Sequence, residues 1–197
     1  PFQLALCPLV AAVAAGNKVT LKPSELTPNT ATIISKIISE TFPVKEVVVI
    51  TGDAMIAADL LKKRWDYIFF TGSVGVGKLV AKAAAENLTP VTLELGGKSP
   101  CIVDETANLE LSARRIVWGK IINAGQTCVA PDYILVDEKV QDSFLDALKS
   151  YIQQFKYEAG SENYTQIIND RNFARLLKLI DSNKIFFGGK SDAKTRY

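Results

Sequence analysis

Short runs of β-branched and aromatic residues alternate with segments of helical periodicity, and this alternation constrains the fold more than any other feature. In the first half of the chain we expect strands at Lys18–Lys22, Val47–Ile50, Tyr67–Phe70 and Val91–Glu94. Helices are expected before and between them: Leu4–Ala15, one opened by Thr27 and Pro28, Met55–Lys63, and one running from the Gly72–Gly77 turn to about Asn87. Strands connected through helices by short loops predict parallel βαβ units and an α/β fold.

The apolar residues predict where the core lies. Leu4–Ala15 is apolar on every side, as expected of a buried helix, and Val47–Ile50 has the composition of a buried strand. Helical stripes predicted to be core are Ile34, Ile37 and Ile38; Ala113, Ile116, Val117 and Ile121; Val140, Phe144, Leu148, Tyr151 and Phe155; and Phe173, Leu176, Leu177 and Ile180. With strands at Tyr133–Val136 and Ile185–Phe187, the second half predicts the start of a second α/β domain. Residues 96–100 are the expected boundary.

The chain has no histidine among its 197 residues. This excludes a Ser-His-Asp triad, a Cys-His pair and histidine-ligated zinc, so any chemistry must come from carboxylates, lysines or thiols, and no metal site is predicted. The net charge of +2, without a basic cluster, argues against a nucleic-acid partner. Cys7, Cys101 and Cys128 lack disulfide-like spacing, which predicts reduced thiols in an intracellular compartment, the cytoplasm first of all.

A glycine-rich turn follows the strand Tyr67–Phe70. Gly72, Gly75 and Gly77 would let backbone N–H groups approach phosphate oxygens at the start of a helix. The spacing nearly matches a Walker A loop, but Leu79 stands where the magnesium-binding Ser or Thr is required. A P-loop-like nucleotide-binding protein is therefore an open alternative, as is a plain strand-to-helix turn.

Two further residues are candidates for chemistry. Glu94 ends a strand where ligands bind in open α/β sheets, and partial desolvation there would make it a stronger general base. Cys128 lies between Gly125 and Pro131, on an expected turn where a thiol is accessible and can be nucleophilic. Cys7 and Cys101 lie inside apolar runs and are expected to be inert packing residues. A solvated glutamate and an unreactive loop cysteine are the simpler interpretations of the two candidates.

These motifs together carry a resemblance. Residues 94–100 (Glu-Leu-Gly-Gly-Lys-Ser-Pro) and 125–133 (Gly-Gln-Thr-Cys-Val-Ala-Pro-Asp-Tyr) resemble the two signatures of the aldehyde dehydrogenase superfamily. Residues 21–28 and 70–73 are similar to its cofactor-binding segments. The Lys-Pro-Ser-Glu and Pro-Asp-Tyr forms look most like class 3 and fatty aldehyde dehydrogenases, and the resemblance runs along essentially the whole chain.

The resemblance implies a domain division and a cofactor site. Residues 1–98 would be a Rossmann-like NAD(P)-binding domain without its N-terminal part, and residues 99–197 a catalytic domain without its C-terminal part. Lys22 and Glu25 would hold the adenosine ribose, and Gly72, Ser73 and Gly77 would contact the pyrophosphate. Glu25 would repel a 2′-phosphate and so favour NAD, while NADP stays possible.

The resemblance also implies a mechanism that needs no histidine. Cys128 would attack the aldehyde to give a thiohemiacetal and then a thioester, which Glu94 would hydrolyse by activating water. The substrates implied are medium- or long-chain or aromatic aldehydes. A homodimer is expected by resemblance alone, and a membrane-anchored parent stays open because some relatives carry a C-terminal hydrophobic tail.

The chain departs from the family pattern at both ends. It begins without Met, and Pro1 matches the final proline of the family's Pro-Trp-Asn-x-Pro segment, whose Asn helps to hold the oxyanion. The Glu-x-Phe-Gly-Pro segment that grips the nicotinamide ribose is absent. We therefore expect a fragment that is inactive alone. A truncated module that binds a nucleotide or a partner subunit without turnover is the remaining alternative.

Overall fold

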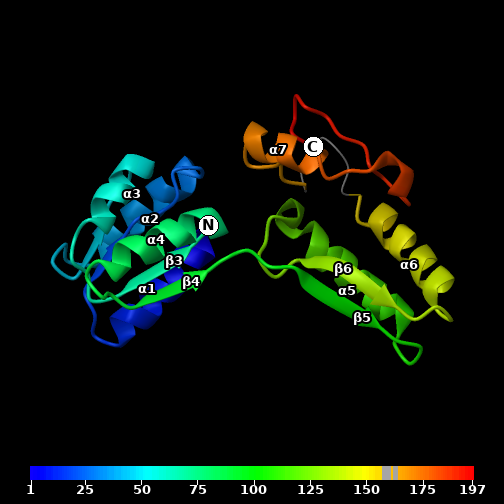
Figure 1. The fold of residues 1–197 in the computed structure, drawn as a ribbon, viewed down its shortest axis with the longest axis horizontal. Helices are drawn as coiled ribbons and strands as arrows, with labels where there is room; N and C mark the ends of the chain where they lie inside the picture. Colours follow the sequence, from blue (N-terminus) through cyan, green and yellow to red (C-terminus); the bar gives the residue numbers. More distant parts are fainter. Residues whose placement is uncertain (157–160, 162–163) are drawn as a thin grey trace. The chain divides into compact units, whose positions relative to one another are not determined.

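The computed structural model describes residues 1–156, 161 and 164–197 (Figure 1). The chain divides into two compact units, Pro1–Leu95 and Gly96–Tyr197. The assignment of residues 1–98 to a cofactor-binding domain and 99–197 to a catalytic domain stays a prediction.

The first unit alternates helices and strands throughout. Its elements are α1 (Phe2–Ala14), β1 (Val19–Leu21), α2 (Pro28–Thr41), β2 (Val47–Val49), α3 (Ala54–Leu61), β3 (Ile68–Thr71), α4 (Val74–Ala85) and β4 (Val91–Glu94). β1 pairs in parallel with β2, and β3 in parallel with β4. The α/β fold class and the parallel strand direction predicted from the alternation are confirmed.

Local sequence explains where these helices begin. Pro28 occupies the first turn of α2, where its fixed φ suits a helix and its missing N–H has no intrahelical role. The Asp53 carboxylate accepts hydrogen bonds from the N–H groups of Met55 (2.9 Å) and Ile56 (3.3 Å), which caps α3. Both cap positions follow a parallel strand, so the helices start at the edge where the strands end.

One core of the first unit lies between α1, α2 and the β1–β2 pair. Leu9, Ile34, Ile38 and Val47 are buried there. Two expectations were wrong. α1 is not buried on every side, because its contacts with α2 and the strands use one face only and leave Leu4 and Val10 exposed. Ile37 is also exposed, since it points away from the face that carries Ile34 and Ile38.

The second unit repeats the strand–helix order. Its elements are β5 (Ser99–Val103), α5 (Leu109–Ile121), a 3₁₀ turn η1 (Ile122–Gly125), β6 (Pro131–Val136), α6 (Gln141–Gln154), α7 (Asp170–Leu177) and a 3₁₀ turn η2 (Ser182–Lys184). β5 and β6 are parallel. Val103, Ala113, Phe144 and Ala147 form a buried core in which α5 and α6 pack against the strands. The α5 and α6 stripes are therefore core, as predicted.

The C-terminal part differs from the prediction. Residues 185–187 form no strand, because the chain turns at Gly188 and Gly189, whose φ values are 75° and 76°. Phe186 lies instead beneath the Lys149 ammonium, 4.3 Å from the ring centre. In the third stripe Phe173 is buried, but Leu177 ends α7 and Ile180 lies beyond the helix, so both are exposed.

Among the described residues, no helix is both long enough and apolar enough to span a membrane.

Candidate active site

The β3–β4 pair fixes Glu94 next to the glycine-rich turn. Thr71 and Glu94 are register partners at the ends of the two strands. One residue further along, the Gly72 N–H donates to the Glu94 carbonyl at 3.0 Å. Because the strands are parallel, both motifs emerge at the same edge, which is where ligands bind in α/β sheets.

The Glu94 side chain is exposed in this structure. β4 ends at Glu94, so its side chain extends beyond the paired part of the strand, and the partial desolvation of its carboxylate stays a prediction. Its role as general base stays a prediction.

The glycine-rich turn enters α4 immediately. Ser73 caps the helix by accepting from the Val76 N–H at 3.3 Å, so Gly75 and Gly77 are helical rather than part of an extended loop. A Cβ on Gly72 would lie 2.5 Å from the Phe70 ring, and one on Gly77 would lie 2.7 Å from a Leu95 methyl group. In both cases the nearest atom is the far end of a side chain rather than backbone. Around Gly75, by contrast, no atom lies within 4 Å of an added Cβ.

Three ionisable side chains gather where β1 and β2 end. The Lys22 ammonium lies 3.1 Å from a Glu25 carboxylate oxygen. A hydrogen bond from its own backbone and then the Lys22 side chain hold the pKa of Glu25 below its usual value, which the nearby Asp53 opposes. Glu25 is therefore a carboxylate at neutral pH, as the predicted ribose contact requires.

In the second unit, Cys128 lies on the turn between α5 and β6, as predicted. The last three residues of η1, which lie upstream of Cys128, have left-handed backbone: the φ values of Asn123, Ala124 and Gly125 are 55°, 52° and 73°. Asn and Gly tolerate this conformation, but for Ala it costs about 1–2 kcal/mol. Backbone strain of this kind persists only where the surrounding structure enforces it.

The two long motifs meet beside Cys128. Residues 123–128, which lead to and include Cys128, are called the cysteine turn below. A Cβ on Gly97 would lie 2.7 Å from the Cys128 carbonyl oxygen, so only glycine leaves room there. One residue later, the Lys98 ammonium lies 2.8 Å from the Asp132 carboxylate. This hydrogen bond holds the pKa of Asp132 below its usual value. Residues 97–100 and 127–133 therefore lie side by side at the start of the β5–β6 pair.

The exposure of the thiols corrects one expectation. Cys128 is half-buried, and so is Cys101 on β5. Cys7 is exposed, because it lies on the face of α1 that packs against nothing in this chain, so its expected place in the core was wrong. Accessibility alone does not single out Cys128.

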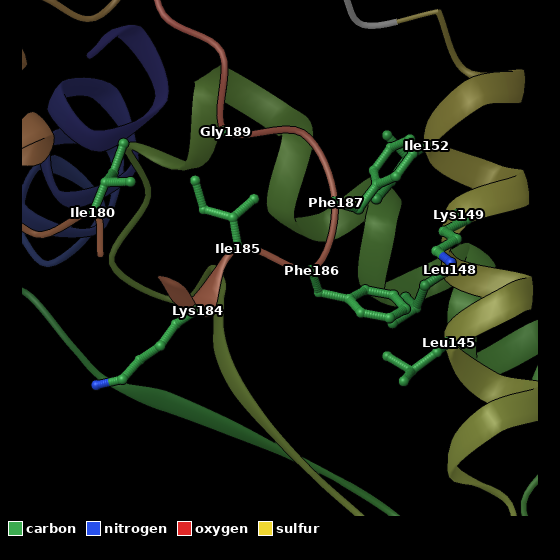
Figure 2. Close-up of a pocket in the computed structure, with 10 residues that line it drawn as sticks. All are labelled: Leu145, Leu148, Lys149, Ile152, Ile180, Lys184, Ile185, Phe186, Phe187 and Gly189. Atoms are coloured by element: carbon green, nitrogen blue, oxygen red, sulfur yellow. The ribbon is translucent and has the colours of Figure 1, made fainter. Parts of the chain in front are cut away.

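Two features of the described residues bear on what the protein could bind outside the two motifs. Among the described residues, no three His, Cys, Asp or Glu side chains are grouped as a metal site would require. A groove of about 400 Å³ runs beside α6, well outside the two motifs (Figure 2). Its lining is mostly apolar: Leu145, Leu148, Lys149, Ile152, Ile180, Lys184, Ile185, Phe186, Phe187 and Gly189.

Comparison with known proteins decides the family. The model of the aldehyde dehydrogenase family matches residues 1–194. The chain belongs to the aldehyde dehydrogenase family. It is 51% identical to a 4,4'-diaponeurosporen-aldehyde dehydrogenase of Staphylococcus aureus and 49% identical to the dimeric NADP-preferring aldehyde dehydrogenase of Mus musculus. In each case the match covers 100% of this chain and 44% of the relative.

Solved structures support the same assignment. A substrate-bound aldehyde dehydrogenase of Staphylococcus aureus matches with a TM-score of 0.91 and 50% identity, over 100% of this chain and 44% of that one. The chain thus spans less than half the length of these aldehyde dehydrogenases. The P-loop-like alternative is not favoured, since α4 already begins at Val74 and leaves no phosphate-cradling loop before Lys78, and the fold is shared with aldehyde dehydrogenases.

The residues of this aldehyde dehydrogenase chain fit a dinucleotide at the strand ends of the first unit. The first N–H groups of α4 have no intrahelical acceptor, and Ser73 accepts only that of Val76 among the capping bonds. The open space at Gly75 lets a phosphate approach them closely. The carboxylate of Glu25 suits ribose hydroxyl groups, which donate hydrogen bonds.

Sequence reasoning named the candidate residues but missed what holds them. Gly97, Lys98, Asp132 and Gln126 were part of the quoted motifs, yet no role was assigned to them individually. The lysine and the aspartate are 34 residues apart and stand at the starts of two successive strands. Lys98 directly precedes β5, and Asp132 is the residue that the β5–β6 register skips between Pro131 and Tyr133, so no simple strand pairing signals this ion pair in the sequence.

Proposed function

We propose that the protein of which this chain is part oxidises aldehydes to carboxylic acids with NAD(P)⁺, through covalent catalysis at Cys128. The observation that carries the proposal is the close approach of Gly97 to the Cys128 carbonyl, which places residues 97–100, the second part of the first signature, beside the turn that carries Cys128. Family membership and the lack of histidine support the same chemistry.

In the proposed reaction, the Cys128 thiolate adds to the aldehyde carbon and forms a thiohemiacetal. Its oxyanion accepts a hydrogen bond from the Cys128 backbone N–H. Bound NAD(P)⁺ supplies the acceptor for the hydride that leaves this carbon, and a thioester on Cys128 remains. Glu94 then takes a proton from water, the hydroxide attacks the thioester, and the acid departs as the Cys128 thiolate is regenerated.

Lys22 and Glu25 would hold the adenosine ribose, and the turn of Gly72, Ser73 and Gly77 would receive the pyrophosphate. The ionised Glu25 repels a 2′-phosphate, which favours NAD. Lys22 lies beside it and offers a phosphate an alternative partner, so NADP is accepted with lower affinity. The mouse relative is NADP-preferring by name, which makes the balance between these two side chains decisive.

We further propose medium- or long-chain or aromatic aldehydes as substrates, in keeping with the similarity to a 4,4'-diaponeurosporen-aldehyde dehydrogenase. A homodimer is proposed from the similarity to the mouse enzyme, which is dimeric by name. An intracellular, reducing location is proposed from the unpaired thiols. Membrane anchoring of the full-length protein stays open.

The test is aldehyde-dependent formation of NADH by the full-length protein and two serine variants. Cys128→Ser should lower turnover by about 10³-fold or more, because a hydroxyl is a far weaker nucleophile than a thiolate at neutral pH. Cys7→Ser, at an exposed thiol, is the matched control and should keep wild-type turnover. Normal turnover in Cys128→Ser would refute the nucleophile assignment.

A further inference from the structure

Hydrogen bonds of Gln126 stabilise the strained turn before Cys128. Its side-chain N–H groups donate to the carbonyls of Asn123 (3.0 Å) and Gln166 (3.1 Å), and its side-chain oxygen accepts from the Ile168 N–H (2.9 Å). In return, the Asn123 side chain donates to the Gln126 carbonyl at 3.1 Å. A backbone bond from the Gln126 N–H to the Asn123 carbonyl (3.0 Å) also spans Ala124, and the side-chain bonds add to it in holding Ala124 in left-handed backbone.

The bonds to Gln166 and Ile168 cross 40 and 42 residues of sequence. In an extended segment the carbonyl of one residue and the N–H two residues later point to the same side. The Gln126 side-chain amide bonds to both, as the N–H and C=O of a single residue in a parallel neighbouring strand would. Residues 166–168 therefore act as a strap that is fixed to the cysteine turn by one side chain.

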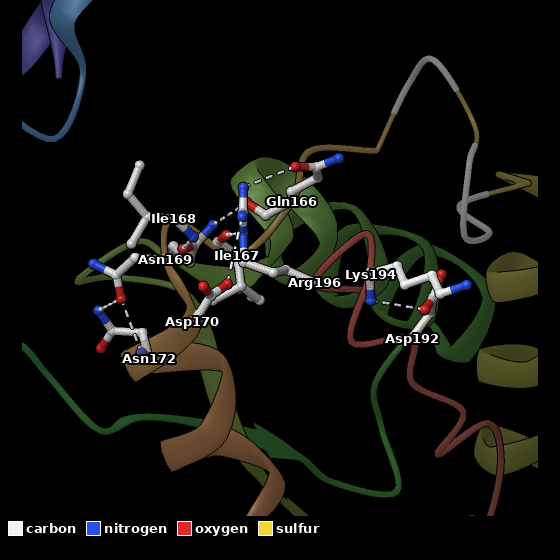
Figure 3. A network of polar contacts seen from close by, with 10 residues as sticks. Gln166, Ile167, Ile168, Asn169, Asp170, Asn172, Asp192, Lys194 and Arg196 are labelled. Carbon is white, nitrogen blue, oxygen red and sulfur yellow. Dashed lines mark hydrogen bonds and ion pairs between the residues drawn. The ribbon is translucent and has the colours of Figure 1, made fainter.

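Arg196 holds the same strap from its other side. The Ile167 carbonyl, which points away from Gln126, accepts from the Arg196 guanidinium at 2.8 Å, and the Ile167 N–H donates to the Arg196 carbonyl at 3.1 Å. A second guanidinium nitrogen donates to the Gln166 side chain at 3.0 Å (Figure 3). The contact of Arg196 with Asp170 is longer, 3.5 Å, and Asp170 is largely exposed, so it adds little.

We propose that Gln126 is a positioning residue for Cys128: it joins the strained cysteine turn to the strap of residues 166–168, which Arg196 locks in place. Gln126 precedes Cys128 by two residues, so a shift of the turn moves the thiol directly. This inference rests on the proposed role of Cys128 as nucleophile. A misplacement of about 1 Å at a reacting atom can cost on the order of 100-fold in rate.

The test uses the full-length enzyme with Gln126→Met, which removes all three side-chain bonds at nearly constant size. Gln126→Glu is a second variant, which keeps the acceptor for Ile168 but places a carboxylate oxygen against the carbonyls of Asn123 and Gln166. Gln153→Met, at an exposed position of α6, is the matched control. Three quantities are measured: kcat and KM for the aldehyde, the pH profile of Cys128 alkylation by iodoacetamide followed by peptide mass spectrometry, and Tm.

We expect Gln126→Met to lower both kcat and the Cys128 alkylation rate by about tenfold or more, with alkylation of Cys7 unchanged. Gln126→Glu should lose at least as much, because its carboxylate repels the two carbonyl oxygens that the Gln126 NH₂ group contacts, and Gln153→Met should match the wild type. Arg196→Met should have a smaller effect alone and add no further loss to Gln126→Met, because Arg196 acts through the same strap. If Gln126→Met does not fold, the inference is tested with Gln126→Glu and Arg196→Met by the same measurements of kcat, KM, Cys128 alkylation and Tm.

Wild-type Cys128 alkylation and kcat in Gln126→Met would overturn the inference, and so would a lowered Tm with an unchanged alkylation profile. Additive losses from Gln126→Met and Arg196→Met would overturn the role of the strap. A wild-type enzyme without aldehyde oxidation would instead refute the proposed function. The alkylation profiles would still decide the positioning of the thiol, because they need no turnover.

Discussion

The turn after β3 in the first unit is held by a backbone bond to the paired strand β4 and by its own helix cap, whereas the cysteine turn of the second unit is held by the Gln126 side chain, which reaches backbone groups far away in sequence. Gly72 is fixed by a backbone bond to Glu94 on the adjacent strand, and Ser73 caps the helix three residues ahead. The turn before Cys128 depends on Gln126, which reaches residues 40 and 42 positions later. Secondary structure alone therefore builds the first turn, and tertiary contacts build the second.

This difference suits the proposed tasks of the two turns. A phosphate site needs backbone N–H groups at a helix start, which any strand-to-helix turn with small residues provides. A nucleophile must be placed to within a fraction of an ångström, which requires contacts that fix one conformation of a strained loop. The strain at Ala124 is the local sign of that requirement.

Among the variants that test this comparison, the largest effect is expected at Gly97, where the two motifs meet. In Gly97→Ala the new methyl group would lie 2.7 Å from the Cys128 carbonyl, a backbone atom that cannot rotate away. The cysteine turn must move, so kcat of the full-length enzyme should fall by about 100-fold. Gly96→Ala is the control, because nothing lies within 4 Å of its added methyl, and its loss should be far smaller. Equal losses in both variants would mean that the contact with Cys128 is unimportant.

A milder result is expected at the corresponding glycine of the first unit. In Gly77→Ala the methyl group meets only the end of the Leu95 side chain, which can change rotamer, and alanine favours a helix by about 1 kcal/mol over glycine. The free energy of unfolding should therefore change by less than about 1 kcal/mol.

Gly75→Ala, in open space, should stabilise α4 yet weaken NAD binding, measured by NADH fluorescence titration. Unchanged affinity in Gly75→Ala would contradict the phosphate site.

The smallest effect is expected for the Lys98–Asp132 pair. Its hydrogen bond lowers the pKa of Asp132 in the folded state, so the pair stabilises the protein above the unfolded-state pKa and loses this contribution as the pH falls through the folded value. Asp132→Asn should lower Tm slightly at pH 7, and the difference should vanish in acid. Lys98 is largely exposed, so salt should weaken the effect as well. If Asp132→Asn still lowers Tm when it is introduced into Lys98→Met, Asp132 must stabilise the protein through another partner.

The same contrast explains what could be predicted from the sequence. The strand Val91–Glu94 coincides with β4, because a β-branched run ended by glycines carries its own signal. The Ile185–Phe187 strand was wrong, since a short apolar run becomes a strand only where a partner strand is present. The exposure of Cys7 was missed for a related reason: the composition of a helix does not say which of its faces is covered.

The candidate site divides in the same manner. Cys128 and Glu94 were identified by motif, and their places on a turn and at a strand end followed from flanking glycine and proline residues. The bonds that join Gln126 to residues 166–168 could not be predicted, because no periodicity links positions 40 residues apart. The left-handed run at Asn123 and Ala124 was equally hidden, since neither residue requires it.

One measurement tests the central claim most directly: peptide mass spectrometry of the full-length Glu94→Gln variant, quenched in acid during aldehyde oxidation. If Glu94 activates the hydrolytic water, this variant should still form one equivalent of NADH in a burst and then accumulate the thioester. The account predicts an NAD⁺-dependent acyl group on the Cys128 peptide and not on those of Cys7 or Cys101, seen as a mass increase equal to the aldehyde less two hydrogen atoms. An acyl group on another residue, or a burst without any acyl group on Cys128, would contradict it.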